Sequence, residues 1–452
     1  MAIEYLGLSS INGPLVVLEG LQDAFYDEIV EFTIEGKQQK MGRIIELNED
    51  KAVIQVFEGT ENMSLQNTHT KLTGRPMEVA VSPDMLGRTF NGIGEPVDGL
   101  GPIVSTDRRD VNGLPLNPVK REYPRNYIRT GISAIDGLTT LIRGQKLPIF
   151  SGNGLPHDQL AAQIVKQASL GEGAEGEFAV VFGAMGVKHD VAEFFRKTFE
   201  ESGVSDHVCM FLNLANDPVV ERLITPKVAL TAAEYLAFEC NMHILVILTD
   251  MTSFAEAMRE VSSSKGEIPS RKGYPGYLYS ELATIYERAG IVESANGSVT
   301  QLPILTMPND DITHPIPDLT GYITEGQVVL DRNLHGQAVY PPISILPSLS
   351  RLKDKGIGER KTRADHSNTM NQLFAAYARG KDAKELMVIL GEAALTEIDL
   401  MYAKFADAFA KEYVSQGYNT DRSIEETLNI GWQLLSMLPR TELKRIDDQL
   451  LD

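Results

Sequence analysis

A short stretch in the first half of the chain has the layout of a phosphate-binding loop, and it reads LPIFSGNGLPHD. The apolar run 147–150 favours a strand, the glycines favour a tight turn, and the apolar spacing from residue 160 onward is typical of a helix. In such a loop, backbone N–H groups and the helix N-terminus surround the phosphates. The loop also supplies a Lys to the β- and γ-phosphates and a Ser or Thr to Mg²⁺.

The side chains that carry out this chemistry are replaced in this chain. His157 stands at the Lys position, Asp158 stands at the Ser/Thr position, and Pro156, which has no N–H group, stands at the preceding Gly position. A carboxylate at Asp158 repels a triphosphate and offers no hydroxyl group to a metal ion. We therefore predict a degenerate loop made of Ser151, Gly152, Asn153, Gly154, Pro156, His157 and Asp158. The alternative is an ordinary strand–turn–helix connection of an α/β sheet.

A second candidate follows the apolar run HILVILTD, which ends in Asp250. An Asp at the end of such a strand can hold Mg²⁺ through water, but it is also a common helix N-cap, and taken alone we favour the cap. A hydrolytic enzyme further needs a carboxylate that polarises the attacking water. The stretch 180–188, where we expect that group, has neither Asp nor Glu. The missing Lys and the missing base together indicate a site that has lost its catalysis.

A third candidate is an arginine in the proline-rich segment PPISILPSLSRLKDKGIG, residues 341–358. The prolines restrict the backbone ahead of Ser348, Ser350 and Arg351. A rigidly held arginine is suited to stabilising phosphate charge at a neighbouring site. The alternative is a surface arginine in a charged patch with the lysines that follow it.

The elements that must position these residues form an alternating pattern of strands and helices over residues 126–345, which is typical of a mostly parallel sheet with helices on both faces. The expected strands are Leu147–Phe150, Phe178–Phe182, Val208–Leu212, His243–Leu248 and Ile304–Met307. The expected helices include Val191–Glu201, Pro226–Phe238 and Thr252–Ser262. The strands are almost continuously apolar, so we expect burial on both faces.

Two further regions flank this sheet. Residues 1–74 alternate short β-type runs with turns, which predicts a small barrel. A Gly- and Pro-rich stretch up to residue 125 is expected to be an ordered connection, because apolar residues recur within it: Leu86, Phe90, Ile93, Val97 and Ile103. Helical spacing marks the C-terminal segments Thr369–Ala378, Ala383–Leu390, Ala394–Tyr413 and Ser423–Met437. We predict a multidomain α/β protein with a barrel at 1–74, a nucleotide-type domain at 75–349 and a helical domain at 350–452.

The composition narrows the class of partner. The 452 residues carry a formal net charge of −20 and no basic block, which argues against nucleic acid as a partner. Cys209 and Cys240 form no CxxC pair, so we expect a reducing, cytosolic compartment. The N-terminus lacks the features of a signal peptide, and no run approaches the ~18 apolar residues of a membrane-spanning helix. Any role in a membrane process is therefore expected to be exerted from outside the bilayer.

Long stretches of the chain resemble a known family, the B subunit of the V/A-type rotary ATPases and ATP synthases, which is the non-catalytic partner of the A subunit. The resemblance covers essentially the whole chain, and the SGNGLPH variant of the loop separates it from the catalytic subunit, whose loop keeps Gly, Lys and Thr. The stretches that carry it are Thr130–Ile164, Phe211–Glu239, Val246–Thr252, Arg271–Gly290, Gly297–Gln327 and Leu346–Gly358.

The resemblance implies a hexamer of three A and three B subunits that alternate around a central rotor stalk, with a peripheral stalk and a membrane sector that translocates hydrogen or other ions. It implies an N-terminal barrel crown, a RecA-like central domain and a C-terminal helical domain. It also implies a regulatory chain on the cytoplasmic side of the membrane. The absence of a long N-terminal extension is typical of prokaryotic members.

At the level of residues, the resemblance implies that Arg351 is an arginine finger. It would reach, in trans, ATP or ADP with Mg²⁺ bound mainly by the A subunit. Ser350 and Tyr322 are weaker candidates at the same interface, and no metal site is expected on this chain alone. One departure is Ser344, where the family usually has Asp or Asn. The alternatives are an autonomous ATPase with an atypical loop, a ring motor on nucleic acid, or weak regulatory nucleotide binding at the degenerate loop.

Overall fold

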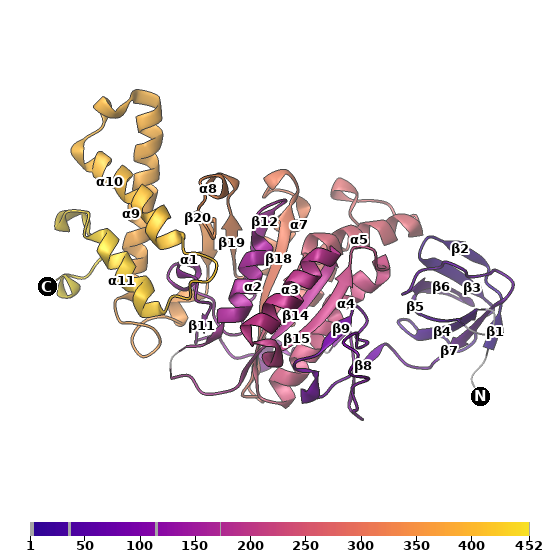
Figure 1. Cartoon of the computed structure of the whole chain (residues 1–452). Coiled ribbons are helices and arrows are strands. Elements are labelled where there is room, and N and C mark those ends of the chain that lie inside the picture. Colours follow the sequence, from indigo (N-terminus) through magenta and orange to yellow (C-terminus); the bar gives the residue numbers. More distant parts are fainter. Residues whose placement is uncertain (1–3, 35–37, 114–115, 172, 452) are drawn as a thin grey trace.

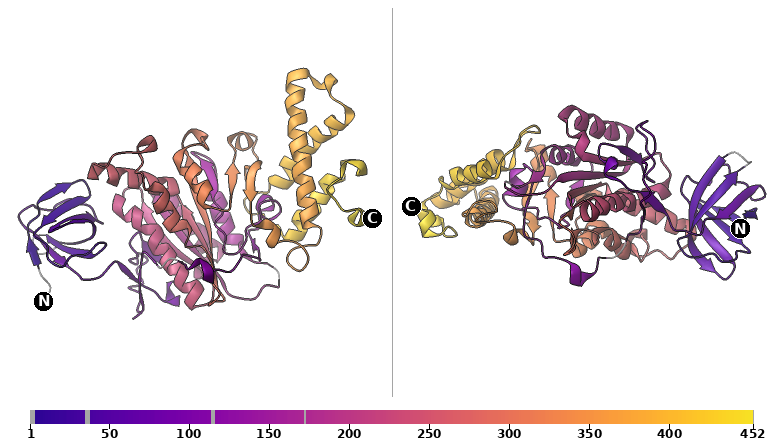
Figure 2. Two further views of the ribbon diagram at one scale, coloured as in Figure 1. Left: turned by 180° about the vertical axis from the view of Figure 1, so that it is seen from behind. Right: turned by 90° about the horizontal axis from the view of Figure 1, so that it is seen from below.

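The computed structural model describes residues 4–34, 38–113, 116–171 and 173–451. Three regions follow one another along an elongated molecule: a small β-structure, a large α/β region and a helical region (Figure 1). The views from behind and from below show the same order, with the two termini at opposite ends (Figure 2). The predicted fold class, a barrel followed by a parallel-sheet domain and a helical domain, is confirmed. Within the described residues, no helix has the length and apolar character needed to cross a bilayer.

The N-terminal region is an antiparallel sheet with the strand order β1-β7-β4-β5-β6-β3-β2. Burial alternates along most of β4, as expected for a pleated strand with one face toward a core. The core includes Val30, Phe32, Ile44 and Ile54, all with essentially no exposed surface. The strands are β1 (Glu4–Leu6), β2 (Ser10–Asn12), β3 (Leu15–Glu19), β4 (Ile29–Ile34), β5 (Gln38–Asn48), β6 (Lys51–Val56) and β7 (Thr68–Leu72).

The predicted ordered connection is confirmed, with one exception. Phe90 and Ile93 are buried, whereas Val97 is 57% exposed and anchors nothing. The short strand β9 (Thr89–Asn91) adds to the edge of the central sheet, parallel to β15. The remaining elements are β8 (Glu78–Ala80), η1 (Pro83–Met85), β10 (Arg108–Asp110) and η2 (Pro118–Lys120).

The central sheet has the order β20-β19-β12-β18-β16-β14-β15-β9. Its strands are β12 (Ile149–Gly152), β14 (Phe178–Val187), β15 (Val208–Leu214), β16 (His243–Thr249), β18 (Ser298–Met307), β19 (Gly326–Leu330) and β20 (Ile343–Ser350), with the short β17 (Gly290–Ile291) beside β18. Its helices are α2 (His157–Gln167), α3 (His189–Ser202), α4 (Val219–Glu234), the π-helical turn η4 (Tyr235–Glu239), α5 (Met251–Lys265), α6 (Leu278–Tyr286), α7 (Pro315–Ile323) and α8 (Arg332–Gly336). Short pieces complete the domain: β11 (Ile128–Arg129), α1 (Ser133–Asp136), β13 (Ser169–Leu170), η3 (Ser205–His207), η5 (Arg271–Gly273) and η6 (Pro308–Asp310).

The strand directions decide where the candidate residues lie. Strand β12 is parallel to both of its neighbours, β18 and β19, so the degenerate loop emerges at the carboxyl edge of the sheet. Strand β20 is antiparallel to β19, and its last residue, Ser350, pairs with Gly326. The segment that carries Arg351 therefore begins at the opposite edge. Helices α2 and α3 pack on one face of the sheet, and α4, α5 and α6 pack on the other.

The C-terminal region contains η7 (Lys353–Lys355), α9 (His366–Leu390), η8 (Glu392–Ala394), α10 (Glu397–Ala408), the π-helical turn η9 (Phe409–Val414), α11 (Ile424–Leu435), η10 (Arg440–Glu442) and η11 (Asp448–Leu450). The two expected helices 369–378 and 383–390 are one helix, α9. It continues through Gly380, which packs closely against α10. A Cβ atom on Gly380 would lie 2.3 Å from the carbonyl oxygen of Tyr402. The expected helix Ala394–Tyr413 was wrong at its start, since α10 begins after the capping box of Thr396.

Several helix and strand limits in the central domain also differ from the prediction. Strand β18 begins at Ser298 and not at Ile304. The helix expected to start at Pro226 starts at Val219 and runs through the proline, within a segment that is almost entirely buried. Burial on all sides offsets the hydrogen bond that the proline removes. Strand β14 continues five residues beyond Phe182, to Val187.

Candidate functional site: a closed loop and an open arginine

The degenerate loop uses its own backbone donors. The Leu155 N–H group donates to the Gly152 carbonyl oxygen at 3.1 Å, and the His157 N–H group donates to the Leu155 carbonyl oxygen at 2.9 Å. Pro156, between them, has no N–H group. Three consecutive positions at the start of α2 thus present no free backbone donor to a phosphate, although the strand–turn–helix layout is retained.

The His157 side chain points back toward the end of the strand. Its Nδ1 atom lies 2.9 Å from the Ser151 hydroxyl oxygen, and its Nε2 atom lies 3.7 Å from Asp158 Oδ1. Both ring nitrogens face groups of the loop itself. The imidazole therefore takes the position of the missing Lys without its reach or its permanent charge.

An ion pair that sequence reasoning missed lies directly against the loop. Arg332, at the start of α8, binds Asp310 with two hydrogen bonds of 2.6 and 2.8 Å, and it donates a third, of 2.9 Å, to the Asn153 carbonyl oxygen. A Cβ atom on Gly152 would lie 2.1 Å from Asp310 Oδ1, so the pair sits directly against the loop. Asp310 follows β18 and Arg332 follows β19, the two neighbours of β12.

The charge around the loop is acidic. Burial raises the pKa of Asp158, the nearby His157 opposes this, and the carboxylates of Asp250 and Asp190 raise it further. Burial also raises the pKa of Asp250, although its hydrogen bonds to Thr306 lower it in part. Carboxylates that already resist ionisation form a poor environment for a triphosphate.

Asp250 is a helix cap, as we favoured. Its Oδ1 atom accepts from the Thr252 N–H group at 2.9 Å at the start of α5, and its Oδ2 atom accepts from the Thr306 hydroxyl at 2.7 Å. Among residues 4–34, 38–113, 116–171 and 173–451, no group of three or more His, Cys, Asp or Glu side chains is arranged to hold a metal ion.

The position expected for a catalytic base requires a correction. The stretch 180–188 lies mostly inside β14 rather than beyond it, because the strand extends to Val187. The first carboxylate after the strand is Asp190, at the start of α3, where its Oδ1 atom accepts from the Val191 N–H group at 3.0 Å. Sequence reasoning missed this carboxylate because the strand end was placed five residues too early.

The second candidate segment is anchored by its serines. The Ser350 hydroxyl donates to the Thr140 carbonyl oxygen at 2.9 Å and accepts from Gln145 Nε2 at 2.8 Å. The Ser348 hydroxyl accepts from the Val329 N–H group at 2.9 Å. Both serines are buried, so they fix the backbone on which the next residue stands.

Arg351 has a different environment from these serines. Its N–H group donates to the Glu325 carbonyl oxygen at 2.9 Å, while its side chain is exposed. The guanidinium group makes no hydrogen bond or ion pair with any residue whose placement is described. Tyr322, on α7, is also exposed, with 73% of its surface accessible. A charged group on a rigid support, without an internal partner, is available to another molecule.

The loop and the arginine lie at opposite edges of the sheet. Phe150 pairs with Val329 and Ser350 pairs with Gly326, which places Gly152 five strand positions from Ser350. At ~3.3 Å per residue this is about 16 Å along the sheet. The structure therefore does not bring the predicted loop residues and Arg351 together into one site.

Comparisons with known proteins cover all three regions. Residues 131–350 match the nucleotide-binding domain of the ATP synthase alpha/beta family, residues 8–74 match its beta-barrel domain, and residues 355–452 match the C-terminal domain of V and A type ATP synthase. The chain is 60% identical over 453 residues to V-type ATP synthase beta chain 2 of Clostridium tetani, which covers 100% of this chain and 98% of that relative. It is 60% identical over 449 residues to the V-type ATP synthase beta chain of Halothermothrix orenii, covering 99% and 97% of the two chains.

A solved structure agrees with these matches. The structure described as a unique ATP synthase subunit from Nanoarcheaum equitans superposes with a TM-score of 0.74 at 39% identity, covering 94% of this chain and 100% of that chain. The resemblance drawn from the sequence is thus confirmed across the barrel, the central domain and the helical domain. The chain belongs to the V-type ATP synthase beta chain family.

Proposed function

We propose that this chain is the non-catalytic, regulatory B subunit of an ion-translocating rotary ATPase or ATP synthase. In this proposal it alternates with catalytic A subunits in a hexameric head, and its Arg351 completes the ATP site of a neighbouring A subunit. The observation that carries the proposal is the contrast between an exposed guanidinium without an internal partner and a nucleotide loop that is closed by its own groups.

The arginine is suited to act on another chain and not on its own loop. About 16 Å of sheet separates the level of Ser350 from that of Gly152, and the two segments leave the sheet at opposite edges. A guanidinium group held on an anchored strand end stabilises the charge that develops on a transferring phosphoryl group. The buried Ser350 anchors the backbone next to Arg351, and the exposed Tyr322 is a second candidate contact with the A subunit.

ATP or ADP with Mg²⁺ then belongs mainly to the A subunit, as its substrate or product. In this proposal the loop 151–158 contributes no chemistry, because the N–H groups of Leu155 and His157 are used internally, His157 is turned toward Ser151, and Asp158 is acidic. The assembled head would contact a central rotor stalk, a peripheral stalk and, through them, a membrane sector from the cytoplasmic side. These partners follow from the proposed subunit identity.

The test is the substitution Arg351→Ala in the complex assembled with the catalytic subunit. We expect the rate of ATP hydrolysis to fall by about 10³–10⁵-fold, the effect of removing an arginine finger in related phosphoryl transfer. Native mass spectrometry should show that the complex still assembles, because the side chain is exposed and supports no packing. The matched control is Lys355→Ala, which removes an exposed cation from the same segment and should leave turnover almost unchanged.

Retention of wild-type turnover by the Arg351→Ala complex would refute the assignment. Turnover by the purified chain alone would favour the rival proposal of an autonomous ATPase with an atypical loop. Calorimetry of the isolated chain with ATP and Mg²⁺ separates these outcomes from weak regulatory binding. We expect no heat of binding, since the loop offers neither a free cation nor free amides at residues 155–157.

A further inference from the structure

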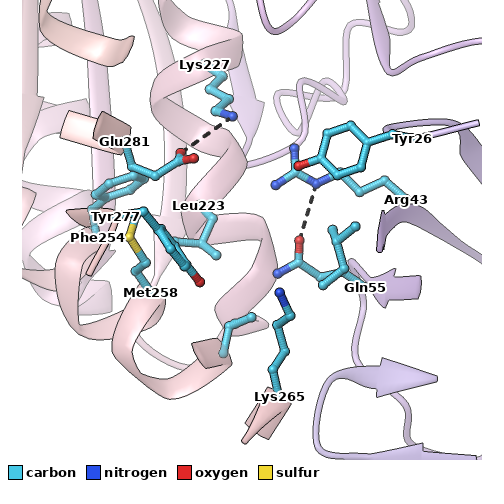
Figure 3. A pocket seen from close by; sticks show the side chains of 12 residues that line it. Tyr26, Arg43, Gln55, Leu223, Lys227, Phe254, Met258, Lys265, Tyr277 and Glu281 are labelled. Carbon is cyan, nitrogen blue, oxygen red and sulfur yellow. Dashed lines mark hydrogen bonds and ion pairs between the residues drawn. The ribbon is translucent and has the colours of Figure 1, made fainter. Parts of the chain in front are cut away.

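A cavity of about 210 Å³ lies where the barrel meets the central domain. Tyr26, Arg43 and Gln55 line it from the barrel, and Lys227 and Lys265 line it from α4 and α5. Figure 3 shows the Lys227 amine and the Arg43 guanidinium approaching the same space from the two domains. The remaining lining is largely apolar, apart from Glu281 and the Tyr277 ring. This junction is remote from the loop 151–158, whose residues do not contribute to it.

The cations of this cavity are poorly paired. Lys227 Nζ lies 3.4 Å from Asn112 Oδ1 and 4.0 Å from Glu281 Oε2. Arg43 lies 3.4 Å from Asp27 and 3.3 Å from Gln55 Oε1. These distances are well beyond the ~2.7–2.9 Å of a charge-assisted hydrogen bond.

Well-formed ion pairs elsewhere in the chain show that the difference belongs to this site. Arg288 binds Glu234 at 2.6 Å, and Arg88 binds Asp98 at 2.6 Å. The side chains of Arg43 and Lys227 are nevertheless about as sheltered as Arg88, with 15% and 13% of their surface exposed against 13% for Arg88. Burial lowers the pKa of Lys227, and the neighbouring Arg43 lowers it further. The carboxylate partners of these two cations, Asp27 at 3.4 Å and Glu281 at 4.0 Å, raise the Lys227 pKa in part but are too distant for close ion pairs. Two sheltered positive charges that are compensated only in part are costly unless a ligand compensates them further.

We propose that this cavity binds a small phosphate-class anion, either inorganic phosphate or a small phosphate ester, between Lys227 and Arg43. The guanidinium group offers paired donors to a tetrahedral oxyanion, and the ammonium group adds a point charge from the opposite wall. A volume of about 210 Å³ is below the ~300–1,000 Å³ of pockets for drug-sized ligands, so a whole nucleotide does not fit. Lys265, at the same cavity, adds positive potential, although it is paired with Glu267 at 2.7 Å.

Such a ligand would join two domains. Arg43 belongs to β5 of the barrel and Lys227 to α4 of the central domain, so an anion between them replaces a repulsion across the junction by two attractions. Binding to the folded, joined state stabilises that state by mass action. The expected consequence is a barrel that is held more firmly on the central domain when the anion is bound.

The experiment compares thermal unfolding and calorimetry of the full chain in inorganic phosphate and in chloride at equal ionic strength, with glycerol 3-phosphate as the ester. We expect a rise in melting temperature with phosphate and a dissociation constant on the order of 1 mM. Lys227→Met and Arg43→Gln should each weaken binding by at least about tenfold, the loss of one charge-assisted contact. Lys227→Met should still fold, because it replaces a poorly paired, sheltered ammonium with an apolar chain of similar length.

Lys197→Met is the matched control, since this lysine is 66% exposed on α3, far from the junction. Its phosphate response should equal that of the unsubstituted chain. A tighter response to the ester than to phosphate would identify an ester as the ligand, and equal responses would identify phosphate itself. The proposal would be overturned if phosphate caused no shift in the melting temperature of the unsubstituted chain. It would also be overturned if Lys227→Met and Arg43→Gln shifted as much with phosphate as the unsubstituted chain does.

Discussion

The polar groups at the two edges of the central sheet differ in whether they have hydrogen-bond partners within the chain. At the carboxyl edge, His157 turns to Ser151 and Arg332 is bound to Asp310 and to the loop carbonyl of Asn153. At the other edge, the backbone before Arg351 is anchored by buried serines, yet the guanidinium group has no partner in the described chain. In the proposed function, the internally bonded groups of the loop belong to a retired site, and the exposed guanidinium group on its anchored support is offered to a neighbouring subunit.

The comparison is tested most strongly by Arg351→Lys in the assembled complex. The charge is kept, but the planar fork that binds two phosphate oxygens is lost. Charge-assisted hydrogen bonds are worth about 1.5–3 kcal/mol, so we expect kcat to fall roughly 10–100-fold. The measurement is steady-state hydrolysis, with Lys355→Arg as the control that changes the same group nearby. Full activity of Arg351→Lys would show that only the charge matters at this edge.

The support beneath the arginine is tested by Gly326→Ala. Gly326 pairs with Ser350, has φ +136°, and would place a Cβ atom 2.2 Å from the Leu349 carbonyl oxygen. The obstacle is backbone, so the strand end must move, at a cost of about 2 kcal/mol. We expect a lower melting temperature of the chain together with slower hydrolysis by the complex.

The control for that substitution is Gly321→Ala, in the interior of α7. No atom lies within 4 Å of the Cβ position there, and alanine favours a helix over glycine by roughly 0.5–1 kcal/mol. This variant should be as stable as the unsubstituted chain or slightly more so, with normal turnover. Similar losses in both variants would show that the β19–β20 pairing does not position the arginine.

The sequence was sufficient for the features that depend on local pattern. Apolar runs predicted five strands of the central sheet, β12, β14, β15, β16 and β18, but not β9, β19 or β20. That the loop has lost its chemistry stays a prediction from the residue types at 156–158. It did not predict the ion pair between Arg332 and Asp310, which are 22 residues apart and meet only because β18 and β19 flank β12. Strand order is a property of the whole sheet, so no local signal near either residue indicates the contact.

The predicted helix limits were wrong where tertiary packing overrides the local helix propensity. Pro226 is a strong signal for a helix start, yet it lies inside the buried helix α4. Gly380 weakens a helix in isolation, yet α9 continues through it because a side chain there would collide with α10. In both places the neighbours that decide the outcome are distant in the sequence. The position of Asp190 was missed for the same kind of reason, since pairing with β15 extends β14 to Val187.

The smallest effect is expected at the closed loop, from Asp158→Asn. Burial raises the pKa of Asp158 above that of the unfolded chain, so between these values the folded protein holds more protons than the unfolded one. Stability therefore decreases as the pH rises above about 4, and the neutral asparagine is free of this loss. The gain from Asp158→Asn should be near zero at pH 4 and should grow to at most about 1 kcal/mol at pH 7.5, because solvent partly screens the charge.

Thermal unfolding between pH 4 and 7.5 measures this difference, with Asp354→Asn, an exposed carboxylate near Arg351, as the control whose effect should stay constant. A loss of stability for Asp158→Asn at pH 7.5 would mean that the ionised carboxylate is stabilised by its surroundings, for example by the His157 ring at 3.7 Å. The loop would then be a functioning charge pair and not a retired site. A gain in stability that grows with pH would instead support the interpretation that the Asp158 carboxylate is only tolerated at the former phosphate position. We expect ATP hydrolysis by the complex to stay unchanged in this variant, because in the proposed function the reacting phosphate lies beside Arg351.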